Sequence, residues 1–282
     1  MPSYADPINV FACEPEWAAL SQELGGSLVS TFSATTAEQD PHHIQARPGL
    51  IAKIRRADIL VCSGADLEVG WLPVLLQKSA NPKVQAGQKG YFMTSKMVKL
   101  LAKPAILDRS MGDVHAAGNP HIQLDPRRMN IVAKKLSQRL QQIDPSHIAE
   151  YQNKLAQFKV RWKKAIKTWQ QTTKEIQGKS IIVHHNSWVY LQQWLKLNKV
   201  AELEPKSGVP PSSSHLSHLL KQMQQTPADL IIYSTYQDPK AAHWLSKKTG
   251  ITAVALPSSV SDNETLFHWM DRLIQLLKDS IK

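Results

Sequence analysis

The sequence predicts an α/β fold of two lobes, each a mostly parallel sheet flanked by helices, joined by one long rigid helix. Short apolar runs alternate with amphipathic segments up to about residue 145, and this alternation resumes after residue 178. Between them, apolar residues recur at helical spacing without a break. A chain of 282 residues is long enough for two domains. We therefore expect an N-terminal lobe over residues 1–145, a linking helix over 146–178 and a C-terminal lobe over 179–282.

The N-terminal lobe begins with a short apolar run at residues 8–13. Pro15 follows at the favoured first turn of a helix, and Gly25 and Gly26 end that helix. A second strand over residues 28–32 leads into a polar loop, a helix ends near Arg56, and residues 57–64 form a third strand. Strands that alternate with helices in this way pair in parallel, with helices on both faces of the sheet.

The segment 146–178 interrupts the alternation. Its apolar residues are mostly three or four positions apart, no proline lies between residues 146 and 177, and Gly178 follows as a stop signal. Residues 146–179 hold eight basic and two acidic residues. The segment's net charge, 8 − 2 = +6, is more than half of the chain's net charge of +11. A basic helix could bind nucleic acid, but its large aromatic residues are spaced to face a core. We therefore expect a solvated basic face and no nucleic-acid partner.

The C-terminal lobe repeats the pattern of strand and helix. Strands are expected near residues 180–184, 200–203, 230–233 and 252–256. Helices are expected over residues 188–195, 213–225, 239–249 and 264–281.

The two cysteines, Cys13 and Cys62, exclude a disulfide-rich scaffold and a CxxC zinc module. Both end predicted strands of the same lobe, so they could form a disulfide in an oxidising compartment, although two buried thiols are the favoured interpretation. No apolar run approaches the roughly 20 residues that span a bilayer. The N-terminus shows no signal peptide, which fits a cytoplasmic protein or one whose leader has been removed.

Four candidate metal ligands follow predicted strands. His42 and His121 lie in the N-terminal lobe, and His185 and Asp262 lie in the C-terminal lobe. Ligands of open parallel sheets bind beyond the carboxyl ends of the strands, so a cleft between the lobes could gather all four. Three imidazoles and one carboxylate suit tetrahedral Zn²⁺. Each residue taken alone also fits a simpler role, which for Asp262 is the N-cap of the last helix.

Three further histidines leave this assignment open. His43 and His184 are the sequence neighbours of two candidates. His115 precedes His121 and is a possible accessory ligand, with a surface loop histidine as the simpler interpretation.

Several segments carry the resemblance to a known family. Residues 40–48 resemble a D-P-H-x-(Y/I)-(E/Q)-x-x-P motif, and residues 119–126 resemble (D/N)-P-H-x-W-L-D-P, with Gln123 in place of the tryptophan. Residues 57–72 are similar to an A-D-L-V…G-A-x-L-E…W-L stretch, and residues 185–188 to H-x-(S/A)-W. Residues 203–208 with 214–216, and Asp262 with residues 266–267, are similar to signatures of the second lobe. These motifs resemble those of the zinc- and manganese-binding solute-binding proteins of bacterial ABC importers, and they cover nearly the whole chain.

The resemblance implies a metal held between two lobes by His42, His121, His185 and Asp262. It implies a monomeric periplasmic protein that captures Zn(II) with high affinity and delivers it to the membrane permease of an ABC importer. Three features depart from the family: the long loop rich in histidine and aspartate is absent, no leader is present, and the pI is 9.6.

The third ligand indicates the choice of metal. Manganese-binding relatives tend to carry a carboxylate where His185 stands, and imidazole suits Zn(II) better than the harder Mn(II). Zn(II) is therefore the expected cargo and Mn(II) the alternative. A two-domain zinc hydrolase is a further alternative, which would need an open coordination position and a base such as Glu204. A site filled by four protein ligands favours a carrier over an enzyme.

Overall fold

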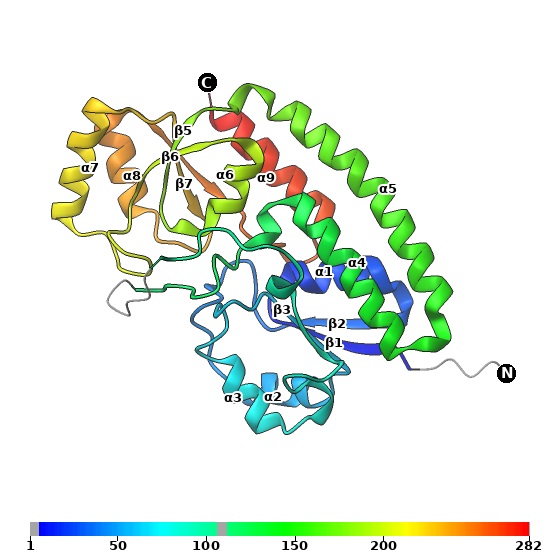
Figure 1. The fold of residues 1–282 in the computed structure, drawn as a ribbon. Helices are drawn as coiled ribbons and strands as arrows, with labels where there is room; N and C mark the ends of the chain where they lie inside the picture. Colours follow the sequence, from blue (N-terminus) through cyan, green and yellow to red (C-terminus); the bar gives the residue numbers. More distant parts are fainter. Residues whose placement is uncertain (1–5, 106–111, 282) are drawn as a thin grey trace.

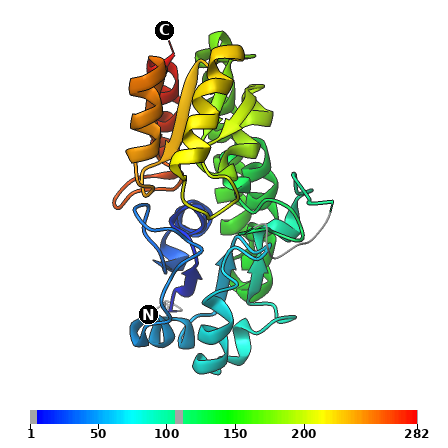
Figure 2. The ribbon, with the colours of Figure 1, turned by 90° about the vertical axis from the view of Figure 1, so that its left-hand side faces the viewer.

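Two parallel sheets of four strands form the framework of the protein. The computed structural model describes residues 6–105 and 112–281. The N-terminal sheet has the order β2-β1-β3-β4, with β1 at Ile8–Ala12, β2 at Val29–Ser33, β3 at Ile59–Cys62 and β4 at Tyr91–Met93. The C-terminal sheet has the order β6-β5-β7-β8, with β5 at Ser180–Val183, β6 at Asn198–Glu202, β7 at Leu230–Ser234 and β8 at Thr252–Leu256. This confirms the predicted fold class, and Figure 2 shows the lobes one above the other.

Helices connect successive strands in both lobes (Figure 1). Their bounds are α1 Pro15–Gly25, α2 Pro48–Arg55, α3 Leu72–Ser79, α4 Pro126–Ile143, α5 Ile148–Thr172, α6 Val189–Leu195, α7 Ser213–Gln225, α8 Lys240–Thr249 and α9 Leu266–Ser280. Helices α1 to α4 each have a proline in the first turn, where its missing N–H is not needed. Ser212 and Thr265 cap α7 and α9 by accepting a bond from a backbone N–H.

The linking helix α5 is shorter than residues 146–178. A short 3₁₀ turn precedes it and another, Lys174–Ile176, follows it. Its 25 residues span about 38 Å. It packs against α1 and α4 of the N-terminal lobe and α9 of the C-terminal lobe. Its buried side chains are the predicted aromatic residues, Tyr151, Phe158, Trp162 and Trp169.

The main hydrophobic core is continuous across both lobes. It joins Trp17 of α1, Trp162 and Trp169 of α5, and Trp188 and Trp269 of the C-terminal lobe. The Trp169 indole N–H donates to Asp271 Oδ1 at 2.6 Å. Two smaller clusters are confined to single lobes, one lined by β3 with α2 and α3, the other by β7 with α7 and α8. The lobes are therefore fixed to each other by packing as well as by the chain.

Cys13 and Cys62 form a disulfide, with Cα atoms 4.8 Å apart and both side chains fully buried. The favoured prediction of two free thiols is wrong. The reason is topological: β1 and β3 are neighbours in the sheet, and Cys13 N–H donates to Val61 O across that pairing.

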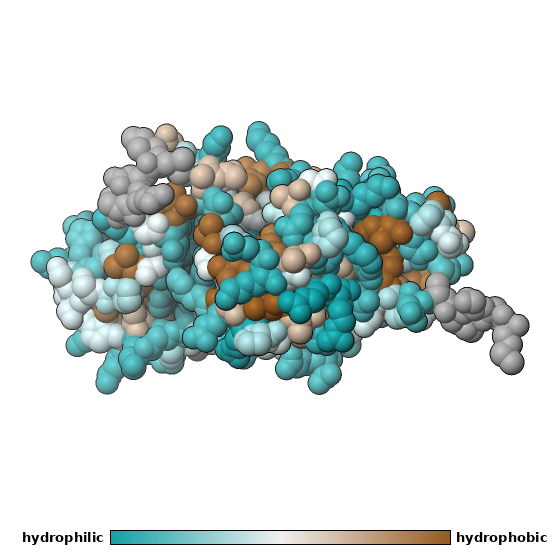
Figure 3. Space-filling view, turned by 90° about the horizontal axis from the view of Figure 1, so that it is seen from below, coloured by the Kyte–Doolittle hydropathy of each residue, from teal (hydrophilic) through white to brown (hydrophobic). Residues whose placement is uncertain are grey.

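The surface is mixed in character. Viewed from below, the molecule is mostly hydrophilic, with apolar atoms in separate patches (Figure 3). Within residues 6–105 and 112–281, no helix combines the length and apolar character needed to cross a membrane.

Candidate metal centre

Three of the four predicted ligands meet between the lobes. His42 lies in the loop between β2 and α2, His121 lies just before α4, and His185 follows β5. One nitrogen of each ring lies within 4.8 Å of those of the other two. The carboxyl ends of parallel strands bring these loops to one place, as expected for an open α/β sheet.

Carboxylates orient two of the three rings. His42 Nδ1 lies 2.7 Å from Asp40 Oδ1, and His185 Nδ1 lies 2.7 Å from Glu204 Oε2. An ionised carboxylate only accepts hydrogen bonds, so Nδ1 of both rings carries the proton and Nε2 keeps its lone pair. Metal-binding histidines have this arrangement, in which the second nitrogen is held by a carboxylate.

The environment of the His121 ring shows whether the residues of this site fit a metal ion. Its ring is buried, and Nε2 has no hydrogen-bond partner in the part of the chain that the structure describes. A buried nitrogen without a partner is unfavourable, because it has lost its bond to water. A cation among the three imidazoles would satisfy this atom, so the residues present fit a metal ion.

A fourth imidazole lies beside this group. His115 Nε2 is 3.3 Å from His42 Nε2, and its Nδ1 is 2.9 Å from the carbonyl oxygen of Ala65. That carbonyl belongs to a turn in which Ala65 and Asp66 have φ values of 51° and 66°. The simpler interpretation of His115 as a surface histidine is wrong, because the ring is partly buried against two other groups.

The environment favours the neutral form of two of these rings, His115 and His121. Burial, together with the neighbouring imidazoles, holds the pKa of His121 well below its ordinary value. Burial and the nearby His42 lower the pKa of His115 to about 4. Burial opposes the charged form of His185 as well, but the hydrogen bond and charge of Glu204 outweigh it and raise that pKa. Neutral imidazole is the form that binds metals.

Asp262, the fourth predicted ligand, is not brought to the histidines. It is exposed in the turn ahead of α9 and lies outside the group of ligand atoms. Glu264 fixes that turn by accepting from Ser261 N–H at 3.0 Å and by pairing with Arg272 at 2.7 Å. Asp262 is not the cap of the last helix either, because Thr265 has that position.

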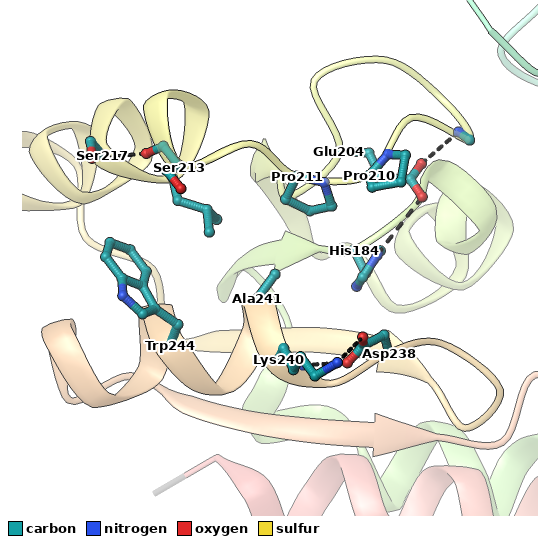
Figure 4. A pocket seen from close by; sticks show the side chains of 12 residues that line it. His184, Glu204, Pro210, Pro211, Ser213, Ser217, Asp238, Lys240, Ala241 and Trp244 are labelled. Atoms are coloured by element: carbon teal, nitrogen blue, oxygen red, sulfur yellow. Dashed lines mark hydrogen bonds and ion pairs between the residues drawn. The ribbon is translucent and has the colours of Figure 1, made fainter.

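His43 and His184, the neighbours of two ligands, lie outside the centre. His43 is exposed. His184 Nε2 lies 3.8 Å from Glu204 Oε1, and the ring lines an adjoining cavity of about 580 Å³. Figure 4 shows His184 and Glu204 at one end of this cavity and Trp244 at the other.

Three buried glutamates were missed by the sequence reasoning. Glu14 and Glu68 lie at the carboxyl ends of β1 and β3, and Glu16 Oε2 accepts from Ser259 Oγ of the other lobe at 2.5 Å. Burial raises the pKa of Glu16 and of Glu68 to about 7. Glu68 accepts from Gly64 N–H at 3.0 Å and so holds the turn that presents the Ala65 carbonyl. The available signal was the place of Glu14, two residues after an apolar strand.

Comparisons with known proteins identify the family of the chain. Residues 10–280 match the family model described as zinc-uptake complex component A, periplasmic. The chain is 23% identical over 253 residues to the metal ABC transporter substrate-binding lipoprotein SloC of Streptococcus mutans, covering 88% of this chain and 79% of that protein. It is 23% identical over 258 residues to the manganese ABC transporter substrate-binding lipoprotein PsaA of Streptococcus pneumoniae, covering 90% and 80%.

Solved structures share the fold. A crystal structure of ZnuA superimposes with a TM-score of 0.77 at 20% identity, covering 97% of this chain and 98% of that one. The laminin-binding adhesin Lmb of Streptococcus agalactiae, in a mutant form, gives 0.78 at 21% identity, covering 98% and 100%. The chain therefore belongs to the zinc-uptake component A family and is a metal-binding solute-binding protein of the ABC-importer type, not an enzyme.

Proposed function

We propose that the protein captures Zn(II) outside the cytoplasm and delivers it to the membrane permease of an ABC importer. The observation that carries the proposal is the convergence of His42, His121 and His185 between the lobes. Two of these rings have Nδ1 on a carboxylate, which leaves Nε2 free for a metal.

The choice of Zn(II) over Mn(II) rests on the ligand atoms. The carboxylates nearest the centre, Asp40 and Glu204, contact the outer nitrogens of the imidazoles. Nitrogen therefore dominates the inner face, which suits zinc, whereas manganese prefers oxygen. The alternative is Mn(II), since PsaA is named as a manganese transporter protein.

The disulfide supports a periplasmic or extracellular location. Disulfides persist in oxidising compartments and are rare in the cytoplasm, and Cys13–Cys62 is fully buried in the N-terminal lobe. We propose that the protein acts there as a monomer, with the metal ion and the permease as its partners.

Metal content and competition test the proposal. Metal-free protein is titrated with Zn(II) and with Mn(II) against a chelating indicator, for the native chain and for His121→Ala. We expect one Zn(II) per chain, bound far more tightly than Mn(II), and binding lost in His121→Ala. Tighter binding of Mn(II) would favour the alternative metal, and unchanged zinc binding by His121→Ala would refute the site.

A further inference from the structure

Residues 112–118, which we term the strap, cross between the two lobes beside the metal centre. On the C-terminal side, Asp113 N–H donates to Ser207 O at 2.9 Å. Gly208, the next residue, has a φ of 77°, in the left-handed region that favours glycine. On the N-terminal side, the strap is held by the bond from His115 Nδ1 to Ala65 O. The strap therefore contacts both lobes, the C-terminal lobe through Asp113 and the N-terminal lobe through His115.

The bonds of His42 and His115 determine where their protons lie. Nδ1 of His42 faces a carboxylate, and Nδ1 of His115 faces a backbone carbonyl. Both groups only accept, so in the neutral rings both Nδ1 atoms carry the hydrogen and both Nε2 atoms carry lone pairs. These lone pairs then face each other across 3.3 Å. Only a proton or a cation between them makes this approach favourable.

The distance between the two Nε2 atoms equals the distance between two nitrogen ligands of one zinc ion. Zn–N bonds are about 2.0–2.1 Å long, so two nitrogens of a tetrahedral zinc site lie about 3.3–3.4 Å apart. The two Nε2 atoms are already 3.3 Å apart. We propose that His115, which lies beside the group of His42, His121 and His185 and next to His42, is the fourth metal ligand and that it takes the place for which the sequence predicts Asp262. This inference rests on the proposed metal-binding function.

The strap is also connected to a second ligand. Gly208 N–H, next to the strap's anchor at Ser207, donates to Glu204 Oε2 at 2.8 Å. The same oxygen accepts from His185 Nδ1. One short series of contacts therefore runs from the strap through the 207–208 turn and Glu204 to His185. If His115 binds the ion, the strap connects that ion to both lobes, because the strap contacts Ser207 of the C-terminal lobe and Ala65 of the N-terminal lobe.

The test compares His115→Ala with Asp262→Ala. His43→Ala is the control for loss of an exposed histidine, and His121→Ala is the reference for loss of the site. Zn(II) affinity is measured by chelator competition. Zinc-edge X-ray absorption counts the imidazoles around the bound ion. We expect His115→Ala to weaken binding on the order of 100-fold, the upper limit for losing a group that only orients a ligand. We expect four imidazoles in the native protein and three in this variant, with Asp262→Ala and His43→Ala unchanged.

Each other outcome is informative. If His121→Ala abolishes binding while His115→Ala leaves the affinity and the imidazole count unchanged, this inference fails and the proposed function stands. If Asp262→Ala causes the larger loss, Asp262 is the fourth ligand and the inference also fails. If His121→Ala has no effect, the proposed function itself fails. Melting of each metal-free variant shows whether a loss of affinity reflects misfolding.

Discussion

Replacing Glu204 tests how much an outer carboxylate contributes to metal affinity. Its Oε2 accepts from both His185 Nδ1 and Gly208 N–H, and the side chain is largely buried. In Glu204→Gln the amide oxygen can accept both bonds, so this change removes the charge and little else. Glu204→Ala leaves both donors without a partner. Loss of such a partner typically lowers metal affinity 10–100-fold, which corresponds to about 1.4–2.7 kcal/mol.

We therefore expect a graded series, with zinc affinity reduced about 10-fold in Glu204→Gln and about 100-fold in Glu204→Ala. The assay is chelator competition at fixed pH and ionic strength. Glu202→Gln is the matched control, because Glu202 lies two residues away and pairs with Lys199 on the surface. The reasoning is refuted if the two Glu204 variants bind zinc as tightly as Glu202→Gln does.

Three further outcomes are expected. His121→Ala should lower zinc affinity by orders of magnitude and the exposed His43→Ala should not, as chelator titration would show; a larger loss in His43→Ala contradicts the assignment. Metal-free protein should unfold cooperatively on the order of 10 °C below protein in thousandfold zinc excess, since binding adds about 4 kcal/mol; unfolded metal-free protein at room temperature contradicts this. Burial raises the pKa of Glu16 from 4.5 to about 7, so the folded protein keeps a proton on this side chain that the unfolded chain loses. The free energy of unfolding should therefore fall by on the order of 3 kcal/mol as the pH rises from 4.5 through 7. Glu16→Gln should therefore melt higher than the native chain at pH 8 and match it near pH 4.5, and equal melting at both pH values refutes this.

Local patterns were sufficient to predict most of the fold. The apolar runs predicted all four strands of the C-terminal sheet, and the residues 213–225 are helical as expected. The linking helix ends earlier than predicted because Thr173, whose hydroxyl bonds to Trp169 O, begins a tighter turn. The disulfide was not decided by the sequence, since only the order of strands places Cys13 beside Cys62.

The metal centre was predicted in part. Strand ends and motifs predicted that His42, His121 and His185 lie close together, and they do, because parallel topology brings strand ends together. The turn before α9 could not be predicted, because it depends on Glu264 pairing with Arg272 eight residues later. The sequence left the role of His115 open between an accessory ligand and a surface histidine, because its position follows from a contact with Ala65, fifty residues earlier. Long-range contacts of loops leave no periodic signal in a sequence.

The core shared by the two lobes has a consequence for dissecting the protein into fragments. A gene cut after residue 178 would leave Trp194 and Phe267 without their ring contacts on α5, and it would leave Trp162 and Trp169 uncovered in the other product. Exposed aromatic surface of this kind promotes aggregation. Neither half is therefore a self-sufficient unit, and recombining lobes from different relatives would require α5, α6 and α9 to be exchanged together.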